Sequence, residues 1–478
     1  MKQKKRPTIE EMLKIQSVAI VGVSAKLGYY WVHSMLQWDH ELRIWLVSKR
    51  GGEVMGHKIY TDLSEIPENI DYAIIAVPYK YVPQTLKECH EKGAKGVTIF
   101  TSGFSELGTD EGRQREIEVQ NILDGLEMRA FGPNCMGLMF PELGFAFMPT
   151  VKRLAGDVGF LSQSGGVAIA TYTSGVEAGV GFSKVFSFGN QVDIRPQELL
   201  DYLGDDTKTK AIGAYIEGAK NGREILEAMI SAAKKKPLVV LKGGRSIEGS
   251  RAASSHTGAL AGNREIWAAA FHQANVLTVN TLEDLIATLS IFSLSPQPKT
   301  EAVGLVAISG GTSVIYTDLC IESGLLVPPT SKETLERLEP LIRDVGTGLG
   351  NPIDLAADYY QDQTTSEVIQ IVGEEPRFSS LIFEADVHNM HQVASIMDAQ
   401  DSLVDYWRAM AKAGKYVVDK LKKPVLVAIP DIAYPIPRAE AWQVFVDAGL
   451  PVFRNISEAV NALARVCRYY KIKEQREK

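Results

Sequence analysis

A single histidine stands in a long stretch of small side chains and is the residue best suited to chemistry. The stretch is Gly243-Gly-Arg-Ser-Ile-Glu-Gly-Ser-Arg-Ala-Ala-Ser-Ser-His256-Thr-Gly-Ala-Leu-Ala-Gly262. A core histidine would have bulky apolar neighbours at helix or strand spacing, and a metal ligand would have Cys, His or Asp partners, but the stretch supplies neither. Small side chains let a loop approach a ligand closely. We therefore predict that His256 is a nucleophile that takes up a phosphoryl group.

Such a histidine needs a carboxylate for its other ring nitrogen and N–H groups for the phosphate. Glu217 follows an apolar run in Tyr215-Ile-Glu-Gly218 and is expected to orient the ring. Ser162-Gln-Ser-Gly-Gly166 predicts a strand-to-helix turn whose backbone amides would hold a phosphate. An N-cap for Ser164 and a surface acid for Glu217 are the structural alternatives. Since all three features fall at one predicted sheet edge, we favour the functional interpretation.

The first predicted turn of the chain suggests a second ligand. Val21-Gly22-Val23-Ser24-Ala25-Lys26-Leu27-Gly28 has only the first glycine of the G-x-G-x-x-G dinucleotide fingerprint. Gly22 permits a tight turn, and the helix expected to follow would offer N–H groups to a phosphate. The next strand ends in Ser48-Lys49-Arg50, where an NAD site would have an acid. Two cations suit a phosphorylated ribose, as in NADP or coenzyme A, and a solvated loop is the structural alternative.

Three more predicted strand ends complete this candidate site. They are Val77-Pro78, Ser102-Gly103-Phe104 and Gly132-Pro-Asn-Cys-Met-Gly137. Open α/β sheets bind ligands at the carboxyl ends of their strands. Because these segments contain no histidine and no paired carboxylates, we predict a binding domain rather than a catalytic one. Cys135 is predicted to be packed and unreactive.

The elements that must position these residues alternate between strand and helix. Nearly continuous apolar runs predict buried parallel strands at 18–23, 44–47, 72–77, 96–100, 158–161, 184–187, 211–216, 237–241, 303–308, 381–383 and 425–429. The segments between them, such as 83–93, predict crossover helices, so the fold class is α/β with doubly wound parallel sheets. The second and third series of strands both open with a strand, Ser-Gly-Gly and a helix, at Ser164 and Ser309. This shared opening predicts two related domains after a distinct first one.

Length and composition limit the remaining possibilities. The chain has 478 residues, enough for about three domains. Its 51 Lys+Arg and 58 Asp+Glu give a net charge of −7, which argues against generic binding to nucleic acid or an anionic membrane. No apolar run reaches the length of a membrane span, no signal peptide is evident, and four scattered cysteines indicate neither a disulfide framework nor a zinc site. His388 and His391 lack a third ligand, so no metal site is predicted. We expect a soluble cytoplasmic protein.

Five motifs together resemble the nucleoside-diphosphate-forming acyl-CoA synthetases, the ADP-forming acetyl-CoA synthetase branch of the succinyl-CoA synthetase superfamily. They are Ser255-His-Thr-Gly-Ala-Leu-Ala-Gly262, Tyr215-Ile-Glu-Gly218, Ser162-Gln-Ser-Gly-Gly166, Gly132-Pro-Asn-Cys135 and Asn351-Pro-Ile-Asp-Leu355. The resemblance covers roughly residues 10 to 465. It implies a Rossmann-like CoA-binding domain at 8–147, and two flavodoxin-like, succinyl-CoA-synthetase-like domains at 150–293 and 301–466, the first of them carrying the phosphohistidine loop.

The resemblance also implies a ligase that interconverts acyl-CoA, ADP and phosphate with acid, ATP and CoA. It makes His256 the phosphorylated residue and Glu217 its stabilising partner. The phosphate-binding turn would be Ser164, Gly165 and Gly166, and the CoA contacts would be Gly22, Ser24, Lys49, Val77, Pro78, Ser102, Gly103 and Asn134.

Two features depart from the family pattern, and one is absent. Bulky residues occupy Gly28-Tyr-Tyr-Trp31, and Ser48-Lys49-Arg50 replaces the usual Asn-Pro-Lys, so either cation could serve. No Walker-type G-x-x-x-x-G-K and no ATP-grasp domain is found. We therefore expect a hetero-oligomer in which an ATP-grasp partner subunit holds most of the Mg²⁺ and ADP or ATP.

The sequence is also compatible with two other functions. The main alternative is a catalytically inactive CoA-binding regulatory or scaffold protein of the same fold, and an NADP-dependent dehydrogenase is weaker because the first domain has no acid/base for hydride transfer.

Overall fold

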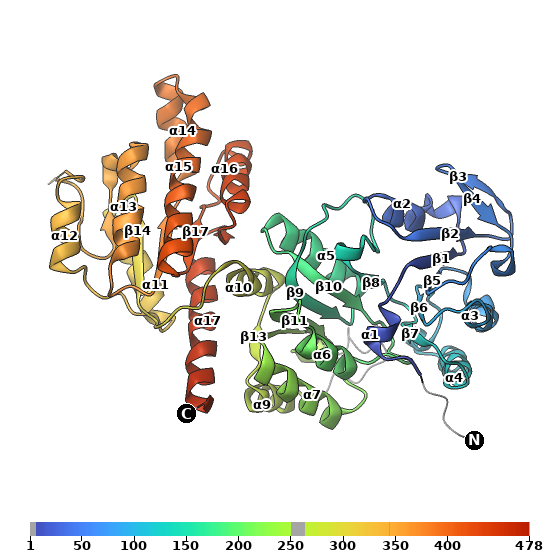
Figure 1. The fold of residues 1–478 in the computed structure, drawn as a ribbon. Coiled ribbons are helices and arrows are strands. Elements are labelled where there is room, and N and C mark those ends of the chain that lie inside the picture. The colour runs from blue at the N-terminus through green and yellow to red at the C-terminus, as the bar shows by residue number, and fades with distance from the viewer. Residues whose placement is uncertain (1–5, 250–262, 344, 478) are drawn as a thin grey trace. The chain divides into compact units, whose positions relative to one another are not determined.

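The structure is a computed structural model that describes residues 6–249, 263–343 and 345–477, and its strands form three sheets (Figure 1). The chain divides into two compact units. Unit 1 consists of Met1–Val176 and Gly181–Leu282 and holds the first two sheets, whereas unit 2 consists of Glu177–Val180 and Glu283–Lys478 and holds the third.

The first sheet has the strand order β3-β4-β2-β1-β5-β6-β7, and every pairing except β3 with β4 is parallel. The strands are β1 (Ser17–Val21), β2 (Arg43–Val47), β3 (Gly52–Val54), β4 (His57–Tyr60), β5 (Tyr72–Ile75), β6 (Gly96–Ile99) and β7 (Arg129–Phe131). The helices are α1 (Ile9–Met12), α2 (Tyr30–Leu36), α3 (Val82–Glu91) and α4 (Asp110–Asp124). Every residue of β1, β5, β6 and β7 is buried, as the continuous apolar runs predicted.

The segment after the first turn differs from the prediction of a helix that starts there. A single 3₁₀ turn, η1 (Ala25–Leu27), follows the glycine turn, and α2 begins only at Tyr30. Ser24 Oγ accepts the N–H of Lys26, so that N–H group is already occupied. The physical reason lies in the bulky residues, because Trp31 is buried and its ring meets the Phe100 ring edge-on at 5.3 Å. Packing of this indole against Phe100 anchors the first turn of α2.

The second sheet has the order β13-β12-β11-β9-β10-β8, parallel except for β8 against β10. Its strands are β8 (Gly137–Met139), β9 (Ala155–Ser162), β10 (Phe182–Ser187), β11 (Ala211–Ile216), β12 (Leu238–Lys242) and β13 (Leu277–Val279). Its helices are α5 (Gly165–Glu177), α6 (Pro196–Asp205), α7 (Gly222–Lys235) and α9 (Arg264–Ala274). Because β8 follows β7 along the chain and pairs with β10, the chain links the two sheets of unit 1 directly.

The third sheet, in unit 2, is entirely parallel with the order β15-β14-β16-β17-β18. Its strands are β14 (Val303–Ala307), β15 (Ile353–Asp354), β16 (Ser380–Glu384), β17 (Val425–Ala428) and β18 (Val452–Phe453). The helices are α10 (Leu282–Leu294), α11 (Gly310–Glu322), α12 (Lys332–Leu338), α13 (Asp362–Glu374), α14 (Val387–Ile396), α15 (Leu403–Tyr416), α16 (Pro435–Asp447) and α17 (Ile456–Glu477). Buried residues of these strands and of α13, α15 and α16 form one hydrophobic core.

The second and third sheets share one topology, which confirms the predicted relationship between them. Strands β13-β12-β11-β9-β10 correspond in order and direction to β18-β17-β16-β14-β15. The Ser-Gly-Gly segments lie at the same place in both, where β9 leads into α5 and β14 leads into α11. Glu217 directly follows β11, and Glu384 ends the corresponding strand β16. Each domain therefore has a glutamate beside the start of a helix at the carboxyl edge of its sheet.

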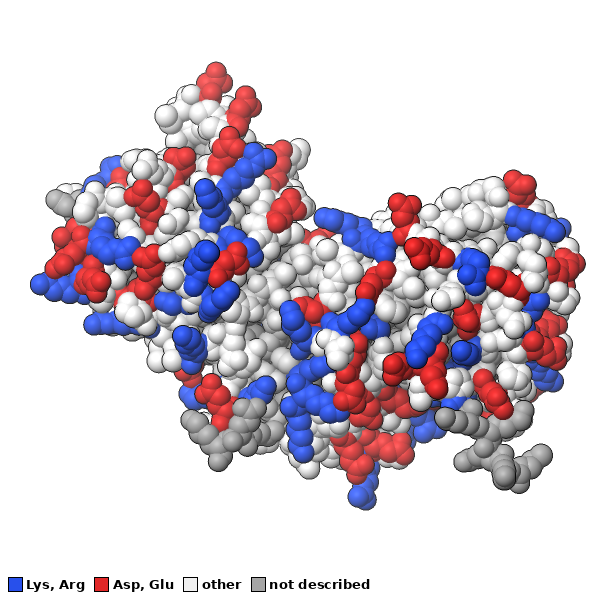
Figure 2. All heavy atoms as spheres, viewed as in Figure 1, with Lys and Arg blue, Asp and Glu red and all other residues white. Residues whose placement is uncertain are grey.

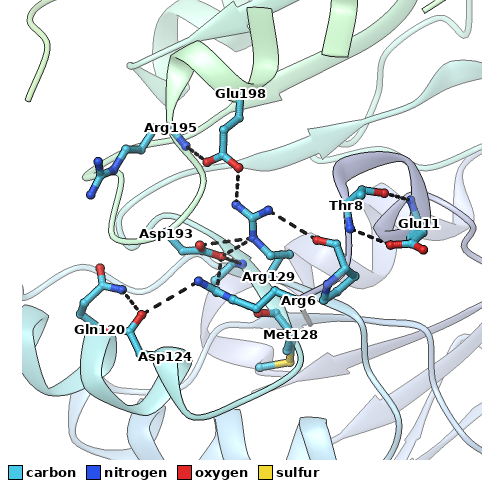
Figure 3. Close-up of polar contacts among 12 residues, drawn as sticks. Arg6, Thr8, Glu11, Gln120, Asp124, Met128, Arg129, Asp193, Arg195 and Glu198 are labelled. Carbon is cyan, nitrogen blue, oxygen red and sulfur yellow. Dashed lines mark hydrogen bonds and ion pairs between the residues drawn. The ribbon is translucent and has the colours of Figure 1, made fainter. Parts of the chain in front are cut away.

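A buried ion network joins the two sheets of unit 1 (Figure 3). The Arg129 guanidinium lies between Asp193, 3.0 Å away, and Glu198, 2.7 Å away, and Arg6 reaches the same Asp193 carboxylate at 2.9 Å. Asp193 Oδ2 also accepts the backbone N–H of Ala130 at 2.8 Å. A surface cavity of about 780 Å³ borders this network. The network fixes the segment after β10 against β7.

The chain carries many charged side chains of both signs. Lys and Arg side chains are interspersed with Asp and Glu on the face drawn in Figure 2. Over the described ranges, no helix combines the length and the apolar character that a bilayer crossing requires.

Candidate functional site

Glu217 lies at the carboxyl edge of the second sheet in a turn that neighbouring strands hold in place. Pairing of β9 with β11 sets Ser162 opposite Tyr215, and Gln163 follows Ser162. The Gln163 side-chain oxygen accepts the backbone N–H groups of Glu217 and Gly218, at 2.9 and 3.1 Å. Tyr215 donates its hydroxyl hydrogen to Glu217 Oε1 at 3.1 Å. The backbone and one carboxylate oxygen of Glu217 are therefore fixed.

The other carboxylate oxygen of Glu217 has no hydrogen-bond partner among the described residues. Glu217 is only 5% exposed, and its Oε2 is buried. A buried acceptor without a donor is costly and rare, so such an atom indicates a missing donor. An imidazole N–H is a donor of the right kind, which is the role predicted for the Glu217 partner.

The predicted phosphate turn forms the start of α5. Ser162 Oγ accepts the N–H of Ser164 at 3.2 Å, and Ser164 Oγ lies 3.4 Å from the N–H of Val167. The N–H groups of Gly165 and Gly166 have no hydrogen-bond partner among the described residues. Free N–H groups and the positive end of a 13-residue helix favour an anion. Ser164 thus caps the helix, as its structural alternative proposed, and still leaves two donors for a phosphate.

Lys242 ends β12, contacts the Glu217 turn and was not among the predicted site residues. Its ammonium donates to the carbonyl oxygen of Glu217 at 2.6 Å and to that of Gly243, and it lies 5.2 Å from the centre of the Trp267 ring. Burial lowers the pKa of Lys242 to about 8, and the neighbouring Glu217 charge opposes this decrease. Burial also raises the pKa of Tyr215, with the Glu217 charge adding to the increase. His256, the predicted phosphohistidine, and the segment around it lie outside the described residues.

The predicted coenzyme contacts lie along the carboxyl edge of the first sheet, on five adjacent parallel strands. Gly22 and Ser24 follow β1, Lys49 follows β2, Val77 and Pro78 follow β5, Ser102 and Gly103 follow β6, and Asn134 follows β7. Hydrogen bonds connect neighbouring segments: Gly22 donates to Val47, Thr101 donates through its hydroxyl to Val77, and Asn134 donates to Thr101. The structure therefore brings these eight residues to one edge.

Two features of this edge fit a ligand with phosphate groups. Gly22 has φ +102°, and a Cβ there would lie 2.6 Å from the carbonyl oxygen of Ala76, so only glycine permits this close turn. The Lys49 side chain is 84% exposed and its ammonium lies 3.1 Å from Asp62. The hydrogen bond from Lys49 to Asp62 raises the pKa of the lysine, so a fully charged cation is available at the edge.

The segment after β7 connects this edge to the second sheet. Its Gly132–Pro133 peptide bond is cis, and Asn134 has φ +58°. Asn190 and Val192 donate their backbone N–H groups to Pro133 and Gly132, both at 3.0 Å. Cys135 is buried and packed as predicted, and burial raises its pKa.

Two histidines that were considered as half of a metal site have another environment. His388 and His391 both lie against the Tyr434 ring, with ring centres 5.6 and 4.5 Å apart. Within the described ranges, no group of three His, Cys, Asp or Glu side chains is arranged to hold a metal ion.

Comparison with known proteins identifies both domains of unit 1. Residues 16–141 match the CoA binding domain family, and residues 155–292 match the succinyl-CoA ligase like flavodoxin domain family. These matches include the two sheet edges described above.

Similarity to known proteins extends over nearly the whole chain. The acetate–CoA ligase (ADP-forming) II alpha subunit of Pyrococcus furiosus is 39% identical over 72% of this chain and 77% of its own length. The corresponding enzyme I alpha subunit from the same organism is 33% identical over 98% of both chains. A solved structure of an acetyl-coenzyme A synthetase from Ca. Korarchaeum cryptofilum, in complex with phosphate and ADP, matches 98% of this chain and 97% of its own, with a TM-score of 0.84 and 25% identity. The chain therefore belongs to the family of the ADP-forming acetate–CoA ligases and corresponds to their alpha subunits.

Proposed function

We propose that this chain is the CoA-binding, phosphohistidine-carrying subunit of an ADP-forming acyl-CoA synthetase that works with an ATP-grasp partner subunit. The observation that carries the proposal is the buried Glu217 oxygen that has no donor among the described residues, directly after the strand next to the one that leads into α5. An inactive CoA-binding scaffold would gain nothing from leaving a buried carboxylate oxygen without a donor.

The first step uses both sheet edges of unit 1. Gly22, Lys49 and Asn134 are proposed to bind the phosphates and the adjoining parts of the acyl-CoA substrate. A phosphate oxygen attacks the thioester carbonyl carbon, the carbon–sulfur bond breaks, and CoA leaves as the thiolate. The product is an acyl phosphate, with its phosphoryl group at the start of α5, where the N–H groups of Gly165 and Gly166 stabilise its charge.

The second step transfers the phosphoryl group to the chain. A neutral imidazole nitrogen of His256 attacks phosphorus, and the carboxylate of the free acid leaves. The ring becomes positively charged during this attack, and the Glu217 carboxylate accepts a hydrogen bond from the N–H of its other nitrogen and stabilises that charge. ADP on the partner subunit then takes the phosphoryl group and His256 returns to the neutral form.

The test is reconstitution. The purified chain is mixed with acetyl-CoA, ADP, phosphate and Mg²⁺, with and without an ATP-grasp subunit of this family, and ATP is measured by luciferase. We expect phosphate-dependent ATP formation only with both subunits, and its loss in the His256→Ala assembly. Rapid ATP formation by the single chain would disprove the need for a partner, and an active His256→Ala assembly would disprove the phosphohistidine.

A further inference from the structure

The orientation of the Gln163 side-chain amide is fixed by its surroundings. Its oxygen accepts two backbone N–H groups, from Glu217 at 2.9 Å and from Gly218 at 3.1 Å. Only the oxygen of an amide can accept hydrogen bonds, so the two N–H donors determine which branch is Oε1. The NH₂ group must therefore occupy the other branch, next to the Glu217 turn.

That NH₂ group is a buried donor with no partner among the described residues. Gln163 is 3% exposed, and both its Nε2 and the Oε2 of Glu217 are buried without a hydrogen bond. Gln163 Nε2 can only donate hydrogen bonds, and Glu217 Oε2, as a carboxylate oxygen, can only accept them. The two residues are linked by the hydrogen bonds from the Glu217 turn to Gln163 Oε1. Two unsatisfied groups of opposite kind in one turn indicate a ligand that has both acceptors and a donor.

The start of α5 is the nearest anion-binding feature along the chain. Gln163 lies two residues before Gly165, whose N–H and that of Gly166 are also without a described partner. Among the described residues, the ammonium that contacts the Glu217 turn belongs to Lys242 and already donates to two carbonyl oxygens, so neutral N–H donors remain for a tetrahedral oxyanion.

We propose that Gln163 is a phosphate-binding residue whose Nε2 donates to an oxygen of inorganic phosphate, and of the phosphoryl group formed from it, at the start of α5. The amide has two roles: its oxygen holds the Glu217 turn, and its nitrogen binds the anion. The inference deepens the proposed function and rests on it for the identity of the anion.

Two variants separate these roles. Gln163→Glu keeps oxygens that can accept from Glu217 and Gly218 but replaces the NH₂ donor by an anion. Gln163→Met keeps the length of the side chain and removes both the acceptor and the donor. Both variants remove the donor and only Gln163→Glu adds a charge, so weaker phosphate binding in both variants reports the missing donor, whereas a loss in Gln163→Glu alone reports charge repulsion and overturns the proposal. Gln114→Glu, an exposed position on α4, is the matched control for the change in charge.

The experiment measures binding of ³²P-labelled inorganic phosphate to the assembled protein by equilibrium dialysis at pH 8, which requires no turnover. Loss of one donor to a charged oxygen predicts a dissociation constant about ten-fold or more higher in both Gln163 variants. Gln114→Glu is expected to match the wild type. CoA affinity should not change in Gln163→Glu. Both variants should lower the melting temperature, Gln163→Glu because it buries a carboxylate next to Glu217 and Gln163→Met because two N–H groups lose their acceptor.

The possible results separate the two proposals. A phosphate dissociation constant for Gln163→Glu within two-fold of the wild type, or no measurable phosphate binding by the wild type, would overturn the role of Gln163. If the wild-type assembly binds phosphate through Gln163 but makes no ATP from acetyl-CoA and ADP, the inference stands and the proposed function fails. If the assembly makes ATP and Gln163→Glu leaves phosphate binding intact, the proposed function stands and the inference about Gln163 fails.

Discussion

Replacing Asp193 by Ala should destabilise unit 1 strongly, because it breaks the buried network at its centre (Figure 3). The carboxylate is 3% exposed and accepts from Arg6, from Arg129 and from the backbone of Ala130. Without it, the Arg129 guanidinium, which is 10% exposed, keeps the partly exposed Glu198 as its one ion partner among the described residues. Removing one partner of a buried ion pair costs about 3–5 kcal/mol, since the remaining charge stays buried.

Hydrogen exchange measured by mass spectrometry can detect this loss of stability in the segments next to Asp193. The N–H groups of Val192 and Ile194 donate to Gly132 and Ala130, and both hydrogen bonds depend on the segment that Asp193 anchors. A loss of about 3–5 kcal/mol corresponds to a decrease in protection of about two to three and a half orders of magnitude in peptides covering 129–134 and 188–195.

The control is Asp124→Ala. Asp124 lies 4.0 Å from the same Arg6, but its side chain is 58% exposed, so we expect a loss below about 1 kcal/mol. A decrease in protection below ten-fold in Asp193→Ala, or equal effects of the two variants, would refute the argument that burial makes this network strong. CoA affinity should also fall in Asp193→Ala, because the Gly132–Asn134 segment is one wall of the proposed coenzyme edge.

Three other predictions concern single residues. Gly22→Ala should abolish measurable CoA binding in calorimetry, because the added Cβ would lie 2.6 Å from the carbonyl oxygen of Ala76; binding at wild-type affinity would disprove the coenzyme edge. Lys49→Ala should weaken CoA binding by about 1 kcal/mol, a modest loss because the ammonium is exposed, whereas a larger loss in Arg50→Ala would assign the contact to Arg50. Burial raises the pKa of Glu384 to about 7 from 4.5, so the folded state binds this proton more tightly than the unfolded state. The contribution of the bound proton to the free energy of unfolding is therefore full below pH 4.5 and is lost as the pH rises through about 7. Calorimetry should therefore show a smaller decrease in the melting temperature of unit 2 from pH 5 to pH 8 in Glu384→Gln than in the wild type, and identical decreases would contradict this pKa.

Much of the fold could be predicted because buried parallel strands produce continuous apolar runs. The runs at 72–77 and 211–216 became β5 and β11 within two residues of the expected ends. The order of the strands could not be predicted in the same way, and β8 shows why. Its three residues pair with β10 through backbone atoms, so side-chain pattern carries no signal for that pairing.

The turn at Gly22 shows where local rules fail. A glycine turn after a strand is normally followed at once by a helix, but the Trp31 side chain packs against Phe100 and delays the start of α2 to Tyr30. Tertiary packing of one large ring was stronger than the local signal.

Some residues of the candidate site could be predicted from the sequence and others could not. Glu217 and the Ser164–Gly166 turn could be predicted, because an acid after a strand and glycines at a helix start have distinctive residue types. Gln163 and Lys242 could not, because their roles depend on strand register: Gln163 meets Glu217 across the β9–β11 pairing, and Lys242 follows from β11–β12. Gln163 lies between two serines and Lys242 lies at the end of a strand, and residues of both kinds are common at such positions for structural reasons alone.

The most direct test of the central claim is covalent labelling. The assembled protein is incubated with Mg²⁺ and γ-³²P-ATP, and the label on this chain is tested for stability in acid and alkali and located by mass spectrometry. The account predicts an acid-labile, alkali-stable phosphoryl group on His256, absent from His256→Ala and reduced in Glu217→Gln, because an amide cannot stabilise the positive charge on the ring. Label that survives acid, or that remains on the His256→Ala chain, would contradict the phosphohistidine mechanism.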